Sequence, residues 1–122
     1  MNQVIEVINT IIENKINISN VINDNGMIFF LYKEIHIFSL HSKSDTDLDA
    51  FYFNVYPAKE FDINRILYLK HNVGLNEVPM VSFDSDDFKT QEALETFRDL
   101  YLVLKSKLYD VDKVFADILK GI

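Results

Sequence analysis

The chain has 122 residues, of which 48% are hydrophobic, and it carries a formal net charge of −7. A chain of this length can bury about two-thirds of the surface that its unfolded form exposes, so we expect one domain spanning residues 1–122. Clustered Lys and Arg supply most of the affinity for phosphate backbones and anionic lipids, so the acidic balance disfavours direct binding to nucleic acid or membranes. The lack of cysteine excludes disulfides, thiolate nucleophiles and the usual structural zinc sites.

The N-terminal segment does not have the features of a signal peptide. It places Glu6 and Glu13 among its apolar residues and lacks both a basic region and a small-residue cleavage site. The longest apolar run, residues 27–32, is far shorter than the ~20 residues that span a bilayer. These patterns predict a cytoplasmic protein without a transmembrane helix.

The first segment has the spacing of an amphipathic helix, and an Asn-rich stretch follows it. Residues 17–26 end at Gly26 and have a composition typical of a turn between helix and sheet. The apolar positions of the helix recur every three or four residues: Val4, Ile5, Ile8, Ile11, Ile12 and Ile16.

The segment 27–56 holds three aromatic-rich runs that predict the sheet. The run 27–32 is apolar at every position, as expected for a strand covered on both faces. Residues 33–35 indicate either a tight hairpin turn or a bend in one long strand that continues through 35–40. Side chains alternate along the third run, so Phe51, Phe53 and Val55 face one way and Tyr52, Asn54 and Tyr56 the other, until Pro57 ends the strand.

The second half of the chain adds one strand and more helices. The spacing predicts a short helix over 61–69 with Asp62 as its N-cap, a brief strand over 79–83, and helices after Thr90 and Asp110. The element order predicts an α+β fold with a mostly antiparallel sheet of about four strands. An N-terminal helix and two C-terminal helices are expected to pack on this sheet.

The candidate chemical groups do not form a known catalytic or metal-binding motif. His36, His41 and His71 lack the i, i+4 helical spacing of a zinc pair, and no phosphate-binding glycine loop is present. The aspartates of 45–49 and 84–87 resemble calcium loops in spacing, but each group lacks the required glycine. We therefore expect no enzyme activity, metal or cofactor, and interpret both groups as acidic loops.

One side of the sheet is the candidate binding surface. In a meander of the three strands, Tyr32, His36, Tyr52, Asn54 and Tyr56 are expected to lie close together, and Tyr is frequent at interface hot spots. The alternative is that a helix covers this side and the tyrosines belong to the core. The predicted partner-binding residues are Asp45, Asp47, Asp49, Tyr52, Asn54, Tyr56, Asp84, Asp86 and Asp87.

In size, acidity, lack of cysteine and element order, the chain resembles the immunity proteins that neutralise contact-dependent growth-inhibition toxins of bacteria. The resemblance implies a cytoplasmic inhibitor, monomeric or homodimeric, that binds and blocks a basic toxin domain such as a nuclease. Two further hypotheses stay open. One is a structural or regulatory protein of a bacterium or phage that self-associates, and the other is a small enzyme that uses His36 with nearby carboxylates.

Overall fold

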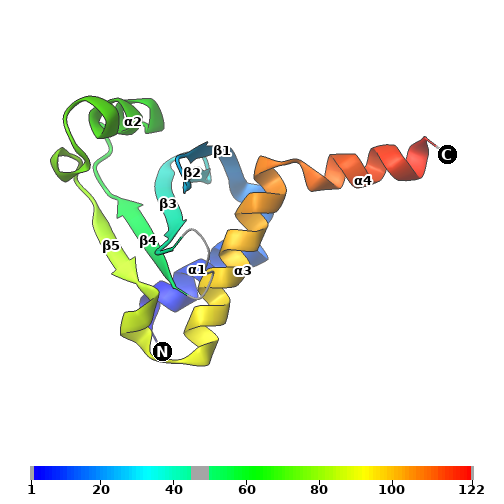
Figure 1. Ribbon diagram of the computed structural model, residues 1–122, viewed down its shortest axis with the longest axis horizontal. Coiled ribbons are helices and arrows are strands. Elements are labelled where there is room, and N and C mark those ends of the chain that lie inside the picture. The colour runs from blue at the N-terminus through cyan, green and yellow to red at the C-terminus, as the bar shows by residue number, and fades with distance from the viewer. Residues whose placement is uncertain (1, 45–49, 122) are drawn as a thin grey trace.

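The computed structural model describes residues 2–44 and 50–121 and has an α+β architecture (Figure 1). Five strands form one antiparallel sheet whose strand order follows the sequence. The strands are β1 (Ile18–Asp24), β2 (Met27–Tyr32), β3 (His36–Ser42), β4 (Phe51–Tyr56) and β5 (Val81–Asp84). The helices are α1 (Gln3–Glu13), α2 (Ile63–Asn72), α3 (Gln91–Leu108) and α4 (Val111–Lys120).

The sheet separates two hydrophobic cores. On one face α1 and α3 pack against side chains that include Ile28 and Phe30 of β2. On the other face α2 packs against Met27 and Phe29 of the same strand. The prediction that residues 27–32 are covered on both faces is therefore confirmed, and it explains why β2 has no polar position before Tyr32.

The first strand of the sheet lies in the Asn-rich segment that was interpreted as a turn. β1 pairs with β2, and Asn25 and Gly26 form the turn between them with φ values of 52° and 88°. Asn-Gly is a preferred pair where a hairpin needs two positive φ angles. The sequence did not predict this strand. Because β1 is an edge strand with few buried side chains, its apolar and polar residues show no clear alternation.

The structure decides between the two interpretations of residues 33–35. Tyr32 pairs with His36 across a tight hairpin, and the backbone N–H of Ile35 donates to the carbonyl oxygen of Tyr32. Lys33 and Glu34 occupy the turn with φ values of 55° and 66°, where longer side chains are strained.

Helix boundaries follow side-chain caps in three of four cases. Asn2, Asp62 and Thr90 each accept a hydrogen bond from a backbone N–H in the first turn of α1, α2 and α3, which confirms Asp62 as an N-cap. Asp110 precedes α4 but has left-handed backbone and makes no side-chain cap, contrary to prediction. Because α1 ends at Glu13, Ile16 lies outside the helix and is 88% exposed rather than part of its apolar face.

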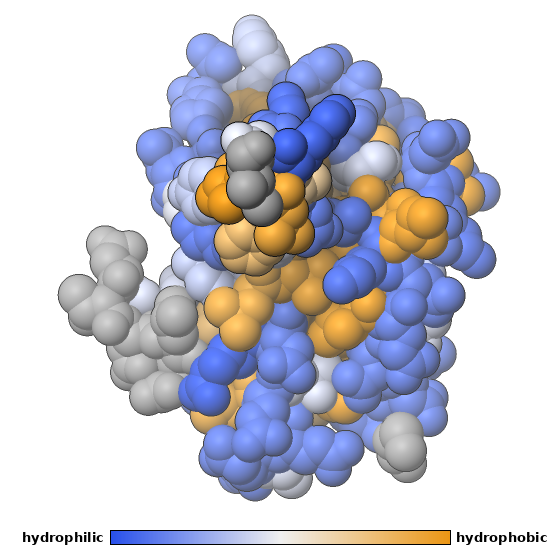
Figure 2. All heavy atoms as spheres, turned by 90° about the vertical axis from the view of Figure 1, so that its right-hand side faces the viewer, coloured by the Kyte–Doolittle hydropathy of each residue, from blue (hydrophilic) through white to orange (hydrophobic). Residues whose placement is uncertain are grey.

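The last helix was predicted to pack on the sheet, but it does not. No residue of α4 is buried, and the helix projects from the end of α3 away from the rest of the molecule (Figure 1). Figure 2 looks at this end of the molecule and shows apolar residues gathered on one side of the projecting helix. Among the helices that the structure describes, none is long and apolar enough to cross a membrane.

Candidate functional site

A row of polar side chains crosses the sheet face that is turned toward α2. Side chains alternate between the faces, and the register pairs Ser39 with Asn54 and His41 with Tyr52. Together with Tyr56 these residues form a continuous line of contacts, which we call the polar row. One end of the row lies under α2 and the other reaches the end of β5.

The end of the polar row beneath α2 is a closed hydrogen-bond network. The Ser39 hydroxyl accepts a hydrogen bond from the Asn54 amide at 2.9 Å and is hydrogen bonded to the Tyr56 hydroxyl at 2.8 Å. Ser39 and Asn54 are at most 1% exposed. Burial raises the pKa of Tyr56 to about 12, so its hydroxyl stays protonated at neutral pH. These groups are buried and hydrogen bonded to one another, so they link β3 to β4.

The other end of the polar row is open. His41 is half-buried, with its Nδ1 atom 3.4 Å from the Asn54 amide nitrogen and its ring centroid 5.1 Å from that of Tyr52. Burial lowers the pKa of His41, with a smaller contribution from the charge of Lys70, so the neutral imidazole is favoured at pH 7. The pair presents a half-buried aromatic surface at this end of the sheet.

The open end borders on a fixed acidic turn. Residues Ser85–Phe88 form a single 3₁₀ turn directly after β5. The buried Ser85 hydroxyl accepts a hydrogen bond from the backbone N–H of Phe51 at 2.9 Å, and the Phe88 ring packs against Phe97 of α3 with centroids 5.7 Å apart. These two anchors fix the backbone between them. We call residues Asp84–Asp87 the acidic turn; its backbone is anchored on both sides of Asp86 and Asp87.

Lys43 links the acidic turn to the polar row. Its Nζ atom lies 2.8 Å from a carboxylate oxygen of Asp84 and 3.0 Å from one of Asp86, and 5.1 Å from the centroid of the Tyr52 ring. The hydrogen bond from Lys43 holds the pKa of Asp84 below its usual value. The two carboxylates raise the pKa of Lys43 in turn. Lys43 thus cancels part of the negative charge, while Asp86 and Asp87 remain exposed.

The residues predicted for partner binding separate into several groups. Tyr52 is half-buried and lies beside the exposed acidic turn, whereas Asn54 and Tyr56 are buried and cannot reach a partner in this structure. Tyr32 and His36 lie on the opposite face, so the predicted cluster of five polar and aromatic side chains does not form. The predicted aspartates at 45, 47 and 49 lie outside the described residues. The backbone N–H of Lys43 donates to the carbonyl of Ala50, which joins the two ends of that segment.

Three members of the site were missed in the sequence. Ser39 is a lone polar residue inside an apolar strand, which is a usable signal for a buried hydrogen-bond network. His41 lies one residue beyond the predicted strand 35–40 but belongs to β3, where it faces Tyr52. The role of Lys43 had no sequence signal, because its partners are more than 40 residues away.

The hydroxyl group of Ser39 is enclosed by its hydrogen-bond partners. Ser39 is bonded to Tyr56 and Asn54, and it has no room for an attacking substrate. Across the part of the chain that the structure describes, no group of three or more His, Asp or Glu side chains is placed to hold a metal ion. The exposed charged groups near the open end are the carboxylates of Asp86 and Asp87.

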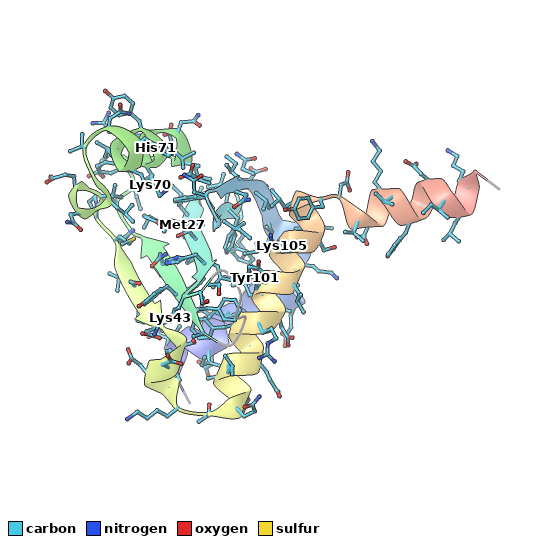
Figure 3. The ribbon with its side chains drawn as sticks, in the orientation of Figure 1. Met27, Lys43, Lys70, His71, Tyr101 and Lys105 are labelled. Carbon is cyan, nitrogen blue, oxygen red and sulfur yellow. The ribbon has the colours of Figure 1, made fainter. Side chains whose placement is uncertain are left out.

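A second polar contact fixes α2 to the sheet. Asp24, at the end of β1, accepts hydrogen bonds from Lys70 at 2.6 Å and from His71 at 2.9 Å. Figure 3 shows Lys70 and His71 on α2, with Lys43 farther from this helix, near the end of β5. The contact positions the helix over the sheet face, while His41 and Tyr52 stay partly exposed.

No protein-family model, curated protein or solved structure matches this chain.

Proposed function

We propose that this chain is a non-catalytic protein-binding module, an immunity-type inhibitor that binds a basic toxin domain in the cytoplasm. The observation that carries the proposal is the acidic turn. Its carboxylates at Asp86 and Asp87 are exposed, its backbone is anchored through Ser85 and Phe88, and Lys43 pairs with Asp86 beside the half-buried Tyr52.

The physical argument rests on charge and rigidity. A net charge of −7 steers a basic partner toward the molecule and raises the association rate. A surface whose backbone is already fixed loses little conformational entropy on binding. Half-buried Tyr52 adds aromatic contact area next to the carboxylates. Such a surface suits a basic active-site cleft, which it would block by occupying it.

Co-expression tests the proposed function directly. The partner to use is the protein encoded immediately upstream of this chain, since inhibitors of this type are paired with their toxins. We expect a stable purified complex and relief of that protein's toxicity. A purified mixture that shows no binding, or toxicity that persists despite binding, contradicts the proposal.

The acidic turn can be tested within that complex by neutralising two exposed aspartates. The variant Asp86→Asn with Asp87→Asn should slow association at low salt by about tenfold and weaken its salt dependence, because steering depends on these charges. The matched control is Glu95→Gln with Asp99→Asn on the exposed side of α3, which changes the net charge equally. Equal association rates for both variants in stopped-flow measurements would show that the acidic turn is not part of the interface.

Self-association is the second candidate function, and a different observation favours it. α4 exposes a contiguous apolar face that the rest of the chain does not cover.

A further inference from the structure

We propose that a groove between α1 and the β2–β3 hairpin receives an arginine side chain of a basic protein partner. The inference rests on the proposed function for the class of partner and goes further by naming the residue type that this partner inserts. The groove has a volume of about 440 Å³, and no residue of the acidic turn lines it. We call it the α1 groove; its lining includes Glu6 and Val7 of α1, Tyr32 of β2 and Phe38 of β3.

One wall of the α1 groove is a side of the helix. Glu6, Val7 and Thr10 line this wall, because residues three and four apart lie on the same side of an α-helix. The Thr10 hydroxyl donates a hydrogen bond to the backbone carbonyl of Glu6 at 2.8 Å. The Glu6 carboxylate, in contrast, is exposed and has no hydrogen bond or ion pair with the residues that the structure describes. With His36 counted as neutral, Glu6 carries the one formal charge in the lining of the groove.

The other wall contains a buried tyrosine whose hydroxyl is open to the groove. Tyr32 lies on the sheet face toward α1 and is 8% exposed. Its hydroxyl makes no hydrogen bond to any described residue. Each side-chain oxygen or nitrogen that is fully buried has a partner in the described part of the chain, so the Tyr32 hydroxyl belongs to the exposed surface. A phenolic hydroxyl both donates and accepts hydrogen bonds, and this one is available to a ligand in the groove.

The combination of these groups favours an arginine side chain. Its methylene stem packs against apolar surface, here Val7 and Phe38, while its guanidinium group stays at the polar edge. The guanidinium carries several N–H donors in one plane, which suit both the Glu6 carboxylate and the Tyr32 hydroxyl as acceptors. It is also less strongly hydrated than the ammonium group of lysine, so it enters a partly apolar site at lower cost. A basic partner that the net charge of −7 attracts supplies such side chains.

One cation of the chain lies beside the groove and provides a test of the charge sign. Lys33 does not line the groove, but its Nζ atom lies 5.9 Å from the centroid of the Tyr32 ring. A positive charge at this position opposes a cationic occupant and favours an anionic one. Because Lys33 is exposed, Lys33→Gln should tighten the binding of an arginine peptide only modestly, by about twofold. Weaker binding of the arginine peptide to this variant contradicts a cationic occupant.

A titration of the isolated chain with blocked tripeptides, followed by NMR, tests the groove. The probe is acetyl-Gly-Arg-Gly-amide, and its control contains citrulline, which keeps the length of the side chain without its charge. The arginine peptide should bind at about millimolar concentration, at least about fivefold more tightly than the citrulline peptide. Glu6→Gln and Tyr32→Phe should each weaken its binding at least about threefold. The matched controls Glu13→Gln on α1 and Tyr68→Phe on α2 change exposed residues outside the groove and should leave the affinity unchanged.

The results of these titrations separate the groove from the proposed function. Because the Tyr32 hydroxyl has no partner among the described residues, Tyr32→Phe should unfold in urea like the wild type, so its loss of binding reports the contact with arginine. Equal affinity for the two peptides, equal loss in the control variants or tighter binding of acetyl-Gly-Glu-Gly-amide overturns the proposal. Tighter binding of free arginine than of the peptide also overturns it, because the groove would then serve a small molecule. None of these titrations uses the toxin, so failed co-expression contradicts the proposed function alone.

Discussion

At the scale of single residues, the polar row contains side chains whose sequence pattern is typical of a half-exposed strand but which are buried in the structure. Asn54 and Tyr56 alternate with Phe53 and Val55, as on a half-exposed strand. In the structure α2 covers their end of the sheet, and Ser39 supplies the partner that each needs. A buried polar group without a partner costs more than a hydrogen bond contributes, so the three residues depend on one another.

Removal of the central hydroxyl should therefore cost more than removal of a terminal one. Ser39→Ala leaves both Tyr56 and Asn54 without their shared partner and should lower the free energy of unfolding by about 2 kcal/mol. Tyr56→Phe keeps the contact between Asn54 and Ser39 and should lower it by about 1 kcal/mol. Urea unfolding of the two variants checks the order, and a larger loss for Tyr56→Phe would contradict the central role of Ser39.

At the scale of elements, the turns of the two N-terminal hairpins use different residue types for similar backbone angles. Both turns need positive φ angles. The first uses Asn25 and Gly26, which adopt them readily, and the Asn23 side chain accepts a hydrogen bond from the Gly26 N–H. The second uses Lys33 and Glu34, whose side chains disfavour this region. The pairing of β2 with β3 therefore holds the second turn in place, although its residues are not those that such turns favour.

Replacement of the strained turn residues should stabilise the fold. Lys33→Asn combined with Glu34→Gly should raise the free energy of unfolding by about 1 kcal/mol, because these residues accept positive φ at lower cost. The same residue pair occurs at Lys59 and Glu60, which do not have positive φ. Lys59→Asn with Glu60→Gly should therefore give no gain in thermal unfolding. A gain of equal size there would show that strain in the hairpin turn is not the cause.

At the scale of the whole molecule, two clusters of charged side-chain contacts join elements that are distant in the sequence. The contact of Asp24 with Lys70 and His71 fixes α2 to β1, and the contact of Lys43 with Asp84 fixes the end of β3 to β5. Hydrogen bonding to Lys70 lowers the pKa of Asp24, and hydrogen bonding to Lys43 lowers that of Asp84. Both carboxylates therefore bind protons less readily in the folded state than in the unfolded state.

The stability of the fold should consequently fall in acid. Because the folded pKa of Asp24 lies below its ordinary value of 3.8, its contribution is present above that pH and is lost as the pH falls through the lowered pKa. Asp24→Asn should reduce the free energy of unfolding at pH 7 by about 1 kcal/mol and flatten its decline in acid. The exposed Asp99→Asn is the control. Identical acid unfolding of Asp24→Asn and wild type would mean that Asp24 makes no net contribution.

The sequence by itself determined the local elements of this protein. Periodicity predicted the amphipathic helices, an unbroken apolar run predicted the doubly covered β2, and Asp62 marked the start of α2. These features depend on residues that are close to each other in the sequence. Only the tertiary structure decided which groups are accessible. The strand register placed Tyr32 and Tyr56 on opposite faces, and the packing of α2 buried Asn54. The apolar pattern of α4 predicted a helix correctly, but it did not predict that the other described residues leave this helix uncovered. Periodicity identifies the apolar side of a helix and does not identify the surface against which that side packs.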